Sequence, residues 1–366
     1  MTASTAPRQH QLALVSIGVV VALAACAPLP TPENQGGISF SLTELDVGGL
    51  ESRATTISPD AGFVAGVVLE IRDAEEVLSI FVYETGTANI DYIRPIDGLL
   101  AWPEAVNDQG DVVGYGTISA GVDFPTVPVA SIDGELVQLA GSGELTFGAA
   151  TAFTVDGRIV GYLGDADEST TQPVMWVDAV PQLLGSLGGD YGQALDITSD
   201  GEVVGWSQVS REPFVSSGFV AKSTVGAATV ISGLGGETTF VRDVSANGVV
   251  LGDGADANGS TSAFTWTADG GITVVATPFG DGSYVLAKAI DVDGRIVGFG
   301  PFDADGEDIR AWTVRDGGTA VLIDDLLNEP EWVVRFASDI AQGVIAADAE
   351  RDGVVRAVIV TAARAT

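Results

Sequence analysis

One pattern of apolar and polar positions recurs along most of the chain. It consists of a small or compact residue, two variable positions, an apolar residue, a turn that contains Gly, two adjacent apolar residues and a closing Gly. The turn glycines of successive copies stand 48, 47, 44, 47, 46 and 49 residues apart: Gly62, Gly110, Gly157, Gly201, Gly248, Gly294 and Gly343. Seven copies at six near-equal spacings indicate an internal repeat rather than chance glycine richness.

Each repeat predicts four short strands. The stretch before the turn is the first strand, and the Asp-Gly or Asn-Gly type turn found in most copies is a strong hairpin signal. The second strand carries the two adjacent apolar residues, which face opposite sides because side chains alternate along a strand. A third strand holds an aromatic or aliphatic segment, such as Met175-Trp176 or Ala311-Trp312, and a short fourth strand follows a second tight turn.

Four strands per unit, a period near 47 residues and burial on both faces of each sheet predict an all-β fold, a seven-bladed β-propeller of four-stranded blades. Residues 38–49 have the pattern of a fourth strand, whereas the last repeat ends at 358–361 with a third strand. We therefore expect the N-terminal strand to pair with the C-terminal blade and close the ring, which also removes an open sheet edge.

The repeat resembles the HAF family of extracellular repeats. Residues 183–206, LLGSLGGDYGQALDITSDGEVVGW, carry the closest match, and the resemblance covers about 38–361. Repeats one, two and seven depart most from the family pattern: the second lacks the aromatic residue of the third strand, and the seventh lacks the closing Gly. The resemblance implies a structural repeat, and it transfers no catalytic residue because the family has none assigned.

The N-terminal segment has the features of an export signal. An uncharged run over 12–25 follows Arg8 and ends in Leu23-Ala24-Ala25-Cys26, which resembles the bacterial lipobox. That resemblance implies a signal peptide over 1–25 and a lipid on the Cys26 sulfur; the alternative is a secretory signal that happens to contain a Cys. Residues 26–37 are rich in Pro and Gly and are expected to be a lipid-anchored tether, and 38–366 are the propeller. The expected location is the extracytoplasmic face of the bacterial envelope, held at the membrane by the lipid.

Composition narrows the possible partners. Hydrophobic residues make up 46% of the chain, which excludes a disordered protein, and 50 acidic against 16 basic residues give a formal net charge of −34. Cleavage before Cys26 removes Arg8, His10 and no carboxylate, so the charge of the mature chain becomes −35. A field this negative repels phosphates, and nucleic acid is therefore excluded as a partner.

Residue types also limit the possible chemistry. The mature chain has no His, and its one Cys is the expected lipid site, so a Ser-His-Asp triad, a Cys-His pair and a zinc site are all excluded in practice. A non-catalytic binding or scaffolding module is the leading interpretation, and no catalytic residue is assigned. The alternative is a glycan-active hydrolase or lyase on the same fold, because such chemistry needs only two carboxylates.

Acidic segments between the second and third strands of several repeats are candidate Ca²⁺ ligands. Alternating Asp residues in a Gly-containing loop offer convergent oxygen atoms, although none has the EF-hand spacing. Solvated acidic turns are the other interpretation, since Asp and Gly are also turn residues. The candidates are Asp165, Asp167, Asp253, Asp256, Asp303, Asp305 and Asp308.

Propeller geometry places these segments on one face, together with the connections between blades. The opposite face carries the first-to-second and third-to-fourth turns, which are mostly short. Because binding residues tend to lie on variable loops, the sequence predicts docking on the acidic face. The expected partner is cationic or bridged by Ca²⁺, either an envelope component or a glycan, because a bare anion would be repelled.

Overall fold

A computed structural model describes nine stretches of the chain. They are residues 39–93, 99–118, 126–132, 134–167, 169–222, 224–279, 285–303, 306–315 and 318–363. The predicted signal peptide over 1–25, Cys26, the tether over 26–37 and the candidate ligand Asp305 lie outside these stretches.

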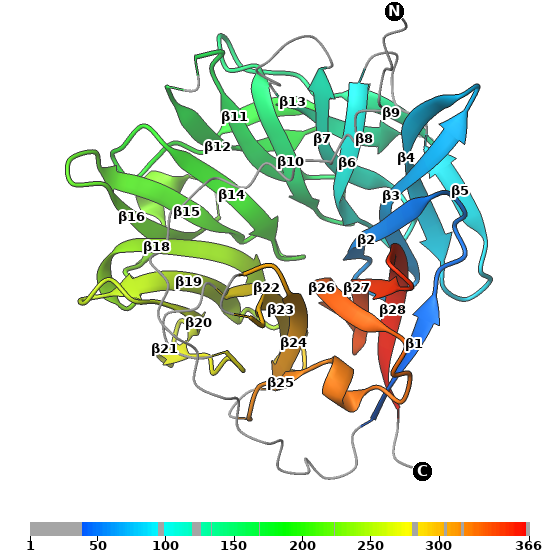
Figure 1. The fold of residues 1–366 in the computed structure, drawn as a ribbon. Coiled ribbons are helices and arrows are strands. Elements are labelled where there is room, and N and C mark those ends of the chain that lie inside the picture. Colours follow the sequence, from blue (N-terminus) through cyan, green and yellow to red (C-terminus); the bar gives the residue numbers. More distant parts are fainter. Residues whose placement is uncertain are drawn as a thin grey trace, which may run out of the picture.

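Seven four-stranded antiparallel sheets form a ring around a central channel, which confirms the predicted seven-bladed β-propeller (Figure 1). We number the blades by the order of their innermost strands. Blade 1 contains β2 (Glu51–Ile57), β3 (Phe63–Arg72), β4 (Glu75–Glu84) and β5 (Ile90–Ile93). Blade 2 contains β6 (Leu99–Val106), β7 (Val112–Ile118), β8 (Thr126–Ile132) and β9 (Glu135–Gln138). Blade 3 contains β10 (Phe147–Phe153), β11 (Ile159–Gly164), β12 (Thr171–Val177) and β13 (Val180–Leu183).

The same order of strands continues around the ring. Blade 4 contains β14 (Gly192–Ile197), β15 (Val203–Ser210), β16 (Val215–Ala221) and β17 (Thr229–Ile231). Blade 5 contains β18 (Gly235–Val244), β19 (Val250–Asp256), β20 (Thr261–Thr267) and β21 (Gly271–Val274). Blade 6 contains β22 (Leu286–Ile290), β23 (Arg295–Pro301), β24 (Ile309–Arg315) and β25 (Val321–Leu322).

Blade 7 is assembled from both ends of the described chain. It contains β26 (Val333–Ala341), β27 (Val344–Arg351) and β28 (Val354–Ala363), and its outermost strand is β1 (Ser39–Glu44). The register of β1 on β28 runs from Ser39 opposite Ala363 to Glu44 opposite Val358. The predicted closure by the N-terminal strand is therefore confirmed.

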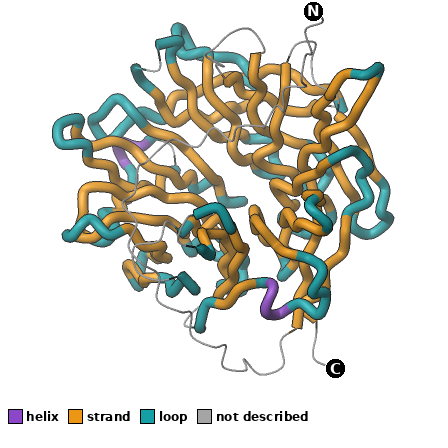
Figure 2. Tube along the Cα trace, in the orientation of Figure 1, coloured by secondary structure: helices purple, strands orange, loops and turns teal. Residues whose placement is uncertain are grey.

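Strands dominate the described residues, as the tube in Figure 2 shows. The helical elements among them are two single 3₁₀ turns, η1 (Val225–Ala227) and η2 (Asp324–Leu326). Within the stretches that the structure describes, no helix has the length and apolar character needed to cross a membrane.

The apolar core is divided among the seven junctions between neighbouring blades, each of which holds one cluster of buried side chains in the described part of the chain. The paired apolar residues of each second strand supply two different junctions. Val64 packs toward blade 7 and Ala65 toward blade 2, and Val250 and Leu251 divide in the same way between blades 4 and 6. Burial on both faces of each sheet, predicted from the adjacent apolar residues, is thus confirmed.

A β-bulge interrupts the innermost strand of every blade at the same place. In blade 1 the register shifts between Ala54 and Thr56, and the bulged strand brings its carbonyl groups over the strand-two glycine. A Cβ at Gly66 would overlap the carbonyl oxygen of Arg53, and the equivalent glycines of blades 2 to 6 meet the same obstruction. In blades 1 to 6 the bulge therefore leaves no room for a Cβ at this position of the second strand.

Candidate functional site

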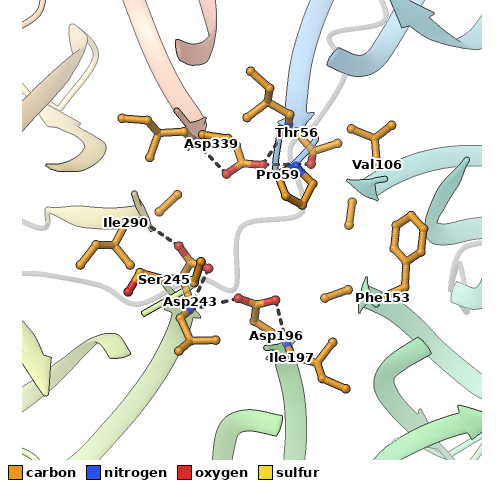
Figure 3. A pocket seen from close by; sticks show the side chains of 18 of the residues that line it. Thr56, Pro59, Val106, Phe153, Asp196, Ile197, Asp243, Ser245, Ile290 and Asp339 are labelled. Atoms are coloured by element: carbon orange, nitrogen blue, oxygen red, sulfur yellow. Dashed lines mark hydrogen bonds between the residues drawn. The ribbon is translucent and has the colours of Figure 1, made fainter. Parts of the chain in front are cut away.

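A cavity of about 430 Å³ lies at one end of the central channel, on the face that carries the first-to-second turns. Innermost strands and turns from all seven blades line it, and Figure 3 shows the carboxylates of Asp196, Asp243 and Asp339 arranged around it. The sequence singled out the opposite, acidic face, because loop length and charge were its only signals. Docking on that face stays a prediction, but the hollow that the structure provides is at this end.

The bulges place one side chain from each blade along the channel wall. These seven residues are partly or fully exposed, whereas the small residue before each of them is buried. A bulge re-aims a side chain in this way because two residues oppose one on the partner strand. The channel residues are Thr55, Glu104, Thr151, Leu195, Arg242, Lys288 and Ser338.

Sequence reasoning missed this ring of channel residues. The two variable positions of each repeat were visible, but a regular strand would turn only every second residue inward. The available signal was a polar pair in a strand otherwise made of apolar residues, such as Thr55-Thr56 or Arg242-Asp243.

In blades 4, 5 and 7 the residue after the channel residue is an Asp. Each of these carboxylates accepts hydrogen bonds that link its blade to the next. Asp196 accepts hydrogen bonds from the backbone N–H of Ile197 at 2.7 Å and of Val244 in blade 5 at 3.0 Å. Asp243 accepts from Val244 at 2.8 Å and from Ile290 in blade 6 at 2.6 Å. Backbone N–H groups that strand pairing leaves open at the bulges are thereby satisfied.

Asp339 and Asp291 continue the same arrangement around the ring. Asp339 accepts from the N–H of Ile57 at 2.9 Å and the hydroxyl of Thr56 at 3.0 Å, both in blade 1. Asp291, at the start of the blade 6 turn, accepts from the N–H of Gly343 in blade 7 at 2.6 Å. Four consecutive junctions, from blade 4 to blade 1, therefore contain a carboxylate bridge.

Three of the carboxyl groups, those of Asp196, Asp243 and Asp339, have raised pKa values. Burial raises the pKa of Asp243 well above its ordinary range, and the neighbouring charge of Asp196 adds to the increase. Burial also raises the pKa of Asp196, although its hydrogen bond with Asp243 opposes the change. Raised pKa values are expected when two carboxyl groups lie side by side in a poorly solvated place, because the two groups resist carrying charge at the same time. Burial raises the pKa of Asp339 to about 6, with Asp243 contributing.

Hydroxyl groups take the place of carboxylates on the other side of the ring. Thr55 of blade 1 donates its hydroxyl proton to the carbonyl of Pro103 in blade 2 at 2.9 Å. Thr151 of blade 3 donates to the carbonyl of Ala194 in blade 4 at 3.0 Å. Because their protons are used in this way, the two hydroxyl oxygens can only accept hydrogen bonds from the channel.

Three channel residues carry charge. Arg242 pairs through Nε with Asp253, an N···O distance of 2.5 Å. Glu104 and Lys288 lie on blades 2 and 6, and no described residue forms a hydrogen bond or ion pair with either side chain. The loss of solvation at this position raises the pKa of Glu104, and the charge of Lys288 opposes the increase.

The predicted Ca²⁺ ligands are mostly engaged within their own turns. Asp165 accepts from the N–H of Ser169 at 2.8 Å, Asp256 from the N–H of Asn258 at 2.8 Å, and Asp303 from the N–H of Glu307 at 3.0 Å. The hydroxyl of Ser169 lowers the pKa of Asp165, and the N–H of Ser260 lowers that of Asp256. The Asp256 bond to the N–H two residues on is that of an Asx turn, and the Asp165 and Asp303 bonds reach four residues on within the same turn.

Asp253 and Asp308 form ion pairs with Arg residues. The prediction that Asp253 and Asp256 lie in a loop is wrong: both belong to β19, and Asp253 is buried beside Arg242. Asp308 pairs with Arg310 at 2.8 Å and with Arg335 of blade 7, and Arg310 lowers its pKa. Asp348 lies within β27, and a two-residue turn follows that strand.

The structure does not bring the candidate ligands together. Among the residues that it describes, no group of three or more His, Cys, Asp or Glu side chains is placed to hold a metal ion. Asp167 is exposed in its turn.

The hydrogen-bonded pair Asp196–Asp243 differs from the arrangement that glycoside hydrolysis requires. Two catalytic carboxyl groups flank the scissile bond at about 5 Å or more, so that a sugar or a water fits between them. Asp196 and Asp243 contact each other, and each already accepts two backbone N–H groups. These two carboxyl groups therefore hold blades together, and the pair lends no support to the glycan-active alternative.

Comparisons with known proteins support the fold. Neither a protein-family model nor a curated protein sequence matches the chain. An oligogalacturonate lyase from Vibrio parahaemolyticus superposes with a TM-score of 0.55 at 9% identity, and the match covers 88% of this chain and 96% of the lyase. At such low identity the likeness shows the propeller architecture alone.

Two further structures are more distant. TolB from Acinetobacter baumannii matches with a TM-score of 0.39 at 13% identity over 66% of this chain. An acylaminoacyl peptidase matches with a TM-score of 0.47 at 12% identity over 82% of this chain. The chain spans 62% of the length of TolB and 50% of the length of the peptidase.

Proposed function

We propose that the chain is a lipid-anchored propeller of the bacterial cell envelope that binds a small ligand in its central cavity and leaves it chemically unchanged. The observation that carries the proposal is the cavity itself, which every blade lines at one end of the channel. A concave, largely preformed site on a rigid scaffold is the usual form of a small-molecule site.

The state of the lining groups favours binding over catalysis. Asp196, Asp243, Asp291 and Asp339 each accept backbone N–H groups on two blades, so they are committed to the scaffold. The mature chain has no His to shuttle protons. The membrane attachment rests on the lipobox resemblance at Cys26, and a Cys26→Ser variant is expected to move from the detergent phase to the soluble fraction.

A ligand screen with a blocked cavity tests the binding function. The full-length protein in detergent is screened by thermal shift against envelope-derived small molecules and short glycans. We expect a hit to raise the melting temperature of the wild type but not of Leu195→Trp, which fills the channel. Leu183→Trp, on the exposed outer strand β13, is the matched control and should respond like the wild type.

Mass spectrometry of the recovered ligand completes the test. Recovery of unchanged ligand supports a binding module, whereas turnover by the protein would establish the enzymatic alternative. A hit that stabilises Leu195→Trp as well as the wild type would place the site elsewhere, with the acidic face as the next candidate.

A further inference from the structure

The channel wall is chemically polarised across the cavity. Blades 1 to 3 present hydrogen-bond acceptors from Thr55, Glu104 and Thr151, whereas blades 5 and 6 present the cations Arg242 and Lys288. The uncharged Leu195 and Ser338 separate the two sets. A ligand that is neutral and symmetric would not use this difference.

From this polarity we propose that the cavity binds a small zwitterion, with its ammonium group at Glu104 and its carboxylate at Lys288. The inference rests on the proposed function and names the class of ligand. Thr55 and Thr151 flank Glu104 in the ring and offer two further acceptors to an ammonium group.

Of the three charged channel residues, Glu104 and Lys288 are the two that we expect to contact a ligand. Arg242 is neutralised by Asp253 at 2.5 Å, and the rim carboxylates are held by backbone N–H groups. Among the described residues no hydrogen bond or ion pair holds the side chain of Glu104 or Lys288; the charge of Lys288 acts on Glu104, and that of Glu104 acts also on Tyr115. A molecule that joins these two opposite charges gains from both contacts.

The other charged groups around the cavity do not reverse this preference. Burial and the neighbouring Asp196 raise the pKa of Asp243, which reduces the tendency of this pair to carry two negative charges beside Lys288. The oxygens of Asp339 and Asp291 face the N–H groups of blades 1 and 7. A ligand that carried only negative charge would be repelled by these groups and by Glu104.

Calorimetric titration of the full-length protein in detergent tests the proposal with defined probes. The zwitterions are glycine, 4-aminobutanoate and 6-aminohexanoate, and the single-charge controls are butylamine and butanoate. We expect one member of the zwitterion series to bind at least about tenfold more tightly than either control, since each charged contact is worth roughly that factor.

Variants assign the two contacts. Glu104→Gln and Lys288→Met should each weaken binding of the best zwitterion by about tenfold. Lys222→Met and Glu202→Gln are matched controls, because this pair, with an N···O distance of 3.4 Å, lies outside the cavity lining. If the single variants fold poorly, the double variant Glu104→Lys/Lys288→Glu keeps both charges and should recover binding with the ligand reversed.

Two results would overturn the inference. In one, butylamine binds the wild type as tightly as the zwitterions, which would mean a simple cation site. In the other, no zwitterion of the series binds. If the broader screen also yields an uncharged ligand that Leu195→Trp loses, the cavity remains a binding site and the zwitterion assignment alone is refuted.

Discussion

Blades 1–3 and blades 4–7 share one backbone plan, including the bulge in the innermost strand, but they use different chemistry there. On the first side, Thr hydroxyls link blade 1 to blade 2 and blade 3 to blade 4. On the second side, carboxylates link every junction from blade 4 to blade 1. The comparison shows that blades of one fold can be linked by different side chains at and near the bulge. The side chains there also determine which polar groups line the channel.

Polar contacts are most numerous where the ring closes. Asp339 links blades 7 and 1 at the end with the first-to-second turns. Asp348 also links them, because it accepts from the N–H of Ala54 at 2.9 Å and pairs with the side chain of Arg53 at 3.2 Å. The hydroxyl of Ser52 also accepts from the N–H of Ala357 at 3.0 Å. Blades 4–7, which carboxylates link, therefore include the blade that is assembled from two distant parts of the chain.

Removing the closing strand should have the largest effect. A chain that starts at Glu51 loses β1, in which Phe40 is buried, and loses the buried Leu45 and Val47. Each buried side chain contributes about 2 kcal/mol, so we expect the free energy of unfolding to fall by more than about 5 kcal/mol, with aggregation through the exposed edge of β28.

Chemical denaturation and light scattering measure that loss. Deletion of residues 27–37 is the control and should change neither quantity. An unchanged unfolding midpoint for the chain that starts at Glu51 would contradict the role of β1 in closure.

Single substitutions at equivalent junctions compare the two sides directly. Asp339→Ala leaves the N–H groups of Ile57 and Ile340 and the hydroxyl of Thr56 without their acceptor, and should cost about 2 kcal/mol of unfolding free energy at pH 7. Thr151→Val removes one shared hydroxyl bond and should cost about 1 kcal/mol. Equal losses in urea denaturation would mean that the two kinds of link are equivalent.

The pH dependence of stability should come mainly from the carboxylate side. The folded pKa of Asp339 is about 6 and that of Asp348 about 7, both above the unfolded value of 3.8, so the folded state binds more protons between these limits. Stability therefore falls as pH rises from about 4 to 7, by up to about 1.4 kcal/mol per unit of pKa difference.

Melting curves between pH 4.5 and 8 measure this trend. We expect the highest melting temperature at the acidic end of this range, since groups with lowered pKa values, such as Asp308, lose their stabilising charge only in still more acidic solution. Asp339→Asn should flatten the curve, and Thr151→Val should leave its shape unchanged. A melting temperature that rises steadily from pH 5 to 8 would contradict the effect of the buried carboxyl groups.

The strand pattern, the number of blades, burial on both faces and the closure of the ring were all predictable from the sequence. They follow from local signals that are repeated: Gly-containing turns, adjacent apolar residues such as Val64-Ala65, and an unmatched strand at each end. The cavity was not predictable, because its lining depends on a bulge, and a polar pair such as Thr55-Thr56 does not by itself show that the strand bulges there. The loop prediction for Asp253 was wrong for a related reason. Its ion pair with Arg242 forms only when β18 and β19 align.

A crystal structure of the protein with the tightest-binding ω-amino acid tests the central claim most directly. The account predicts the ligand in the cavity at the end with the first-to-second turns, with its nitrogen toward Glu104 on the side of blades 1–3 and its carboxylate toward Lys288 on blade 6. Density for the ligand on the acidic face, or in the cavity with the nitrogen toward Lys288, would contradict it.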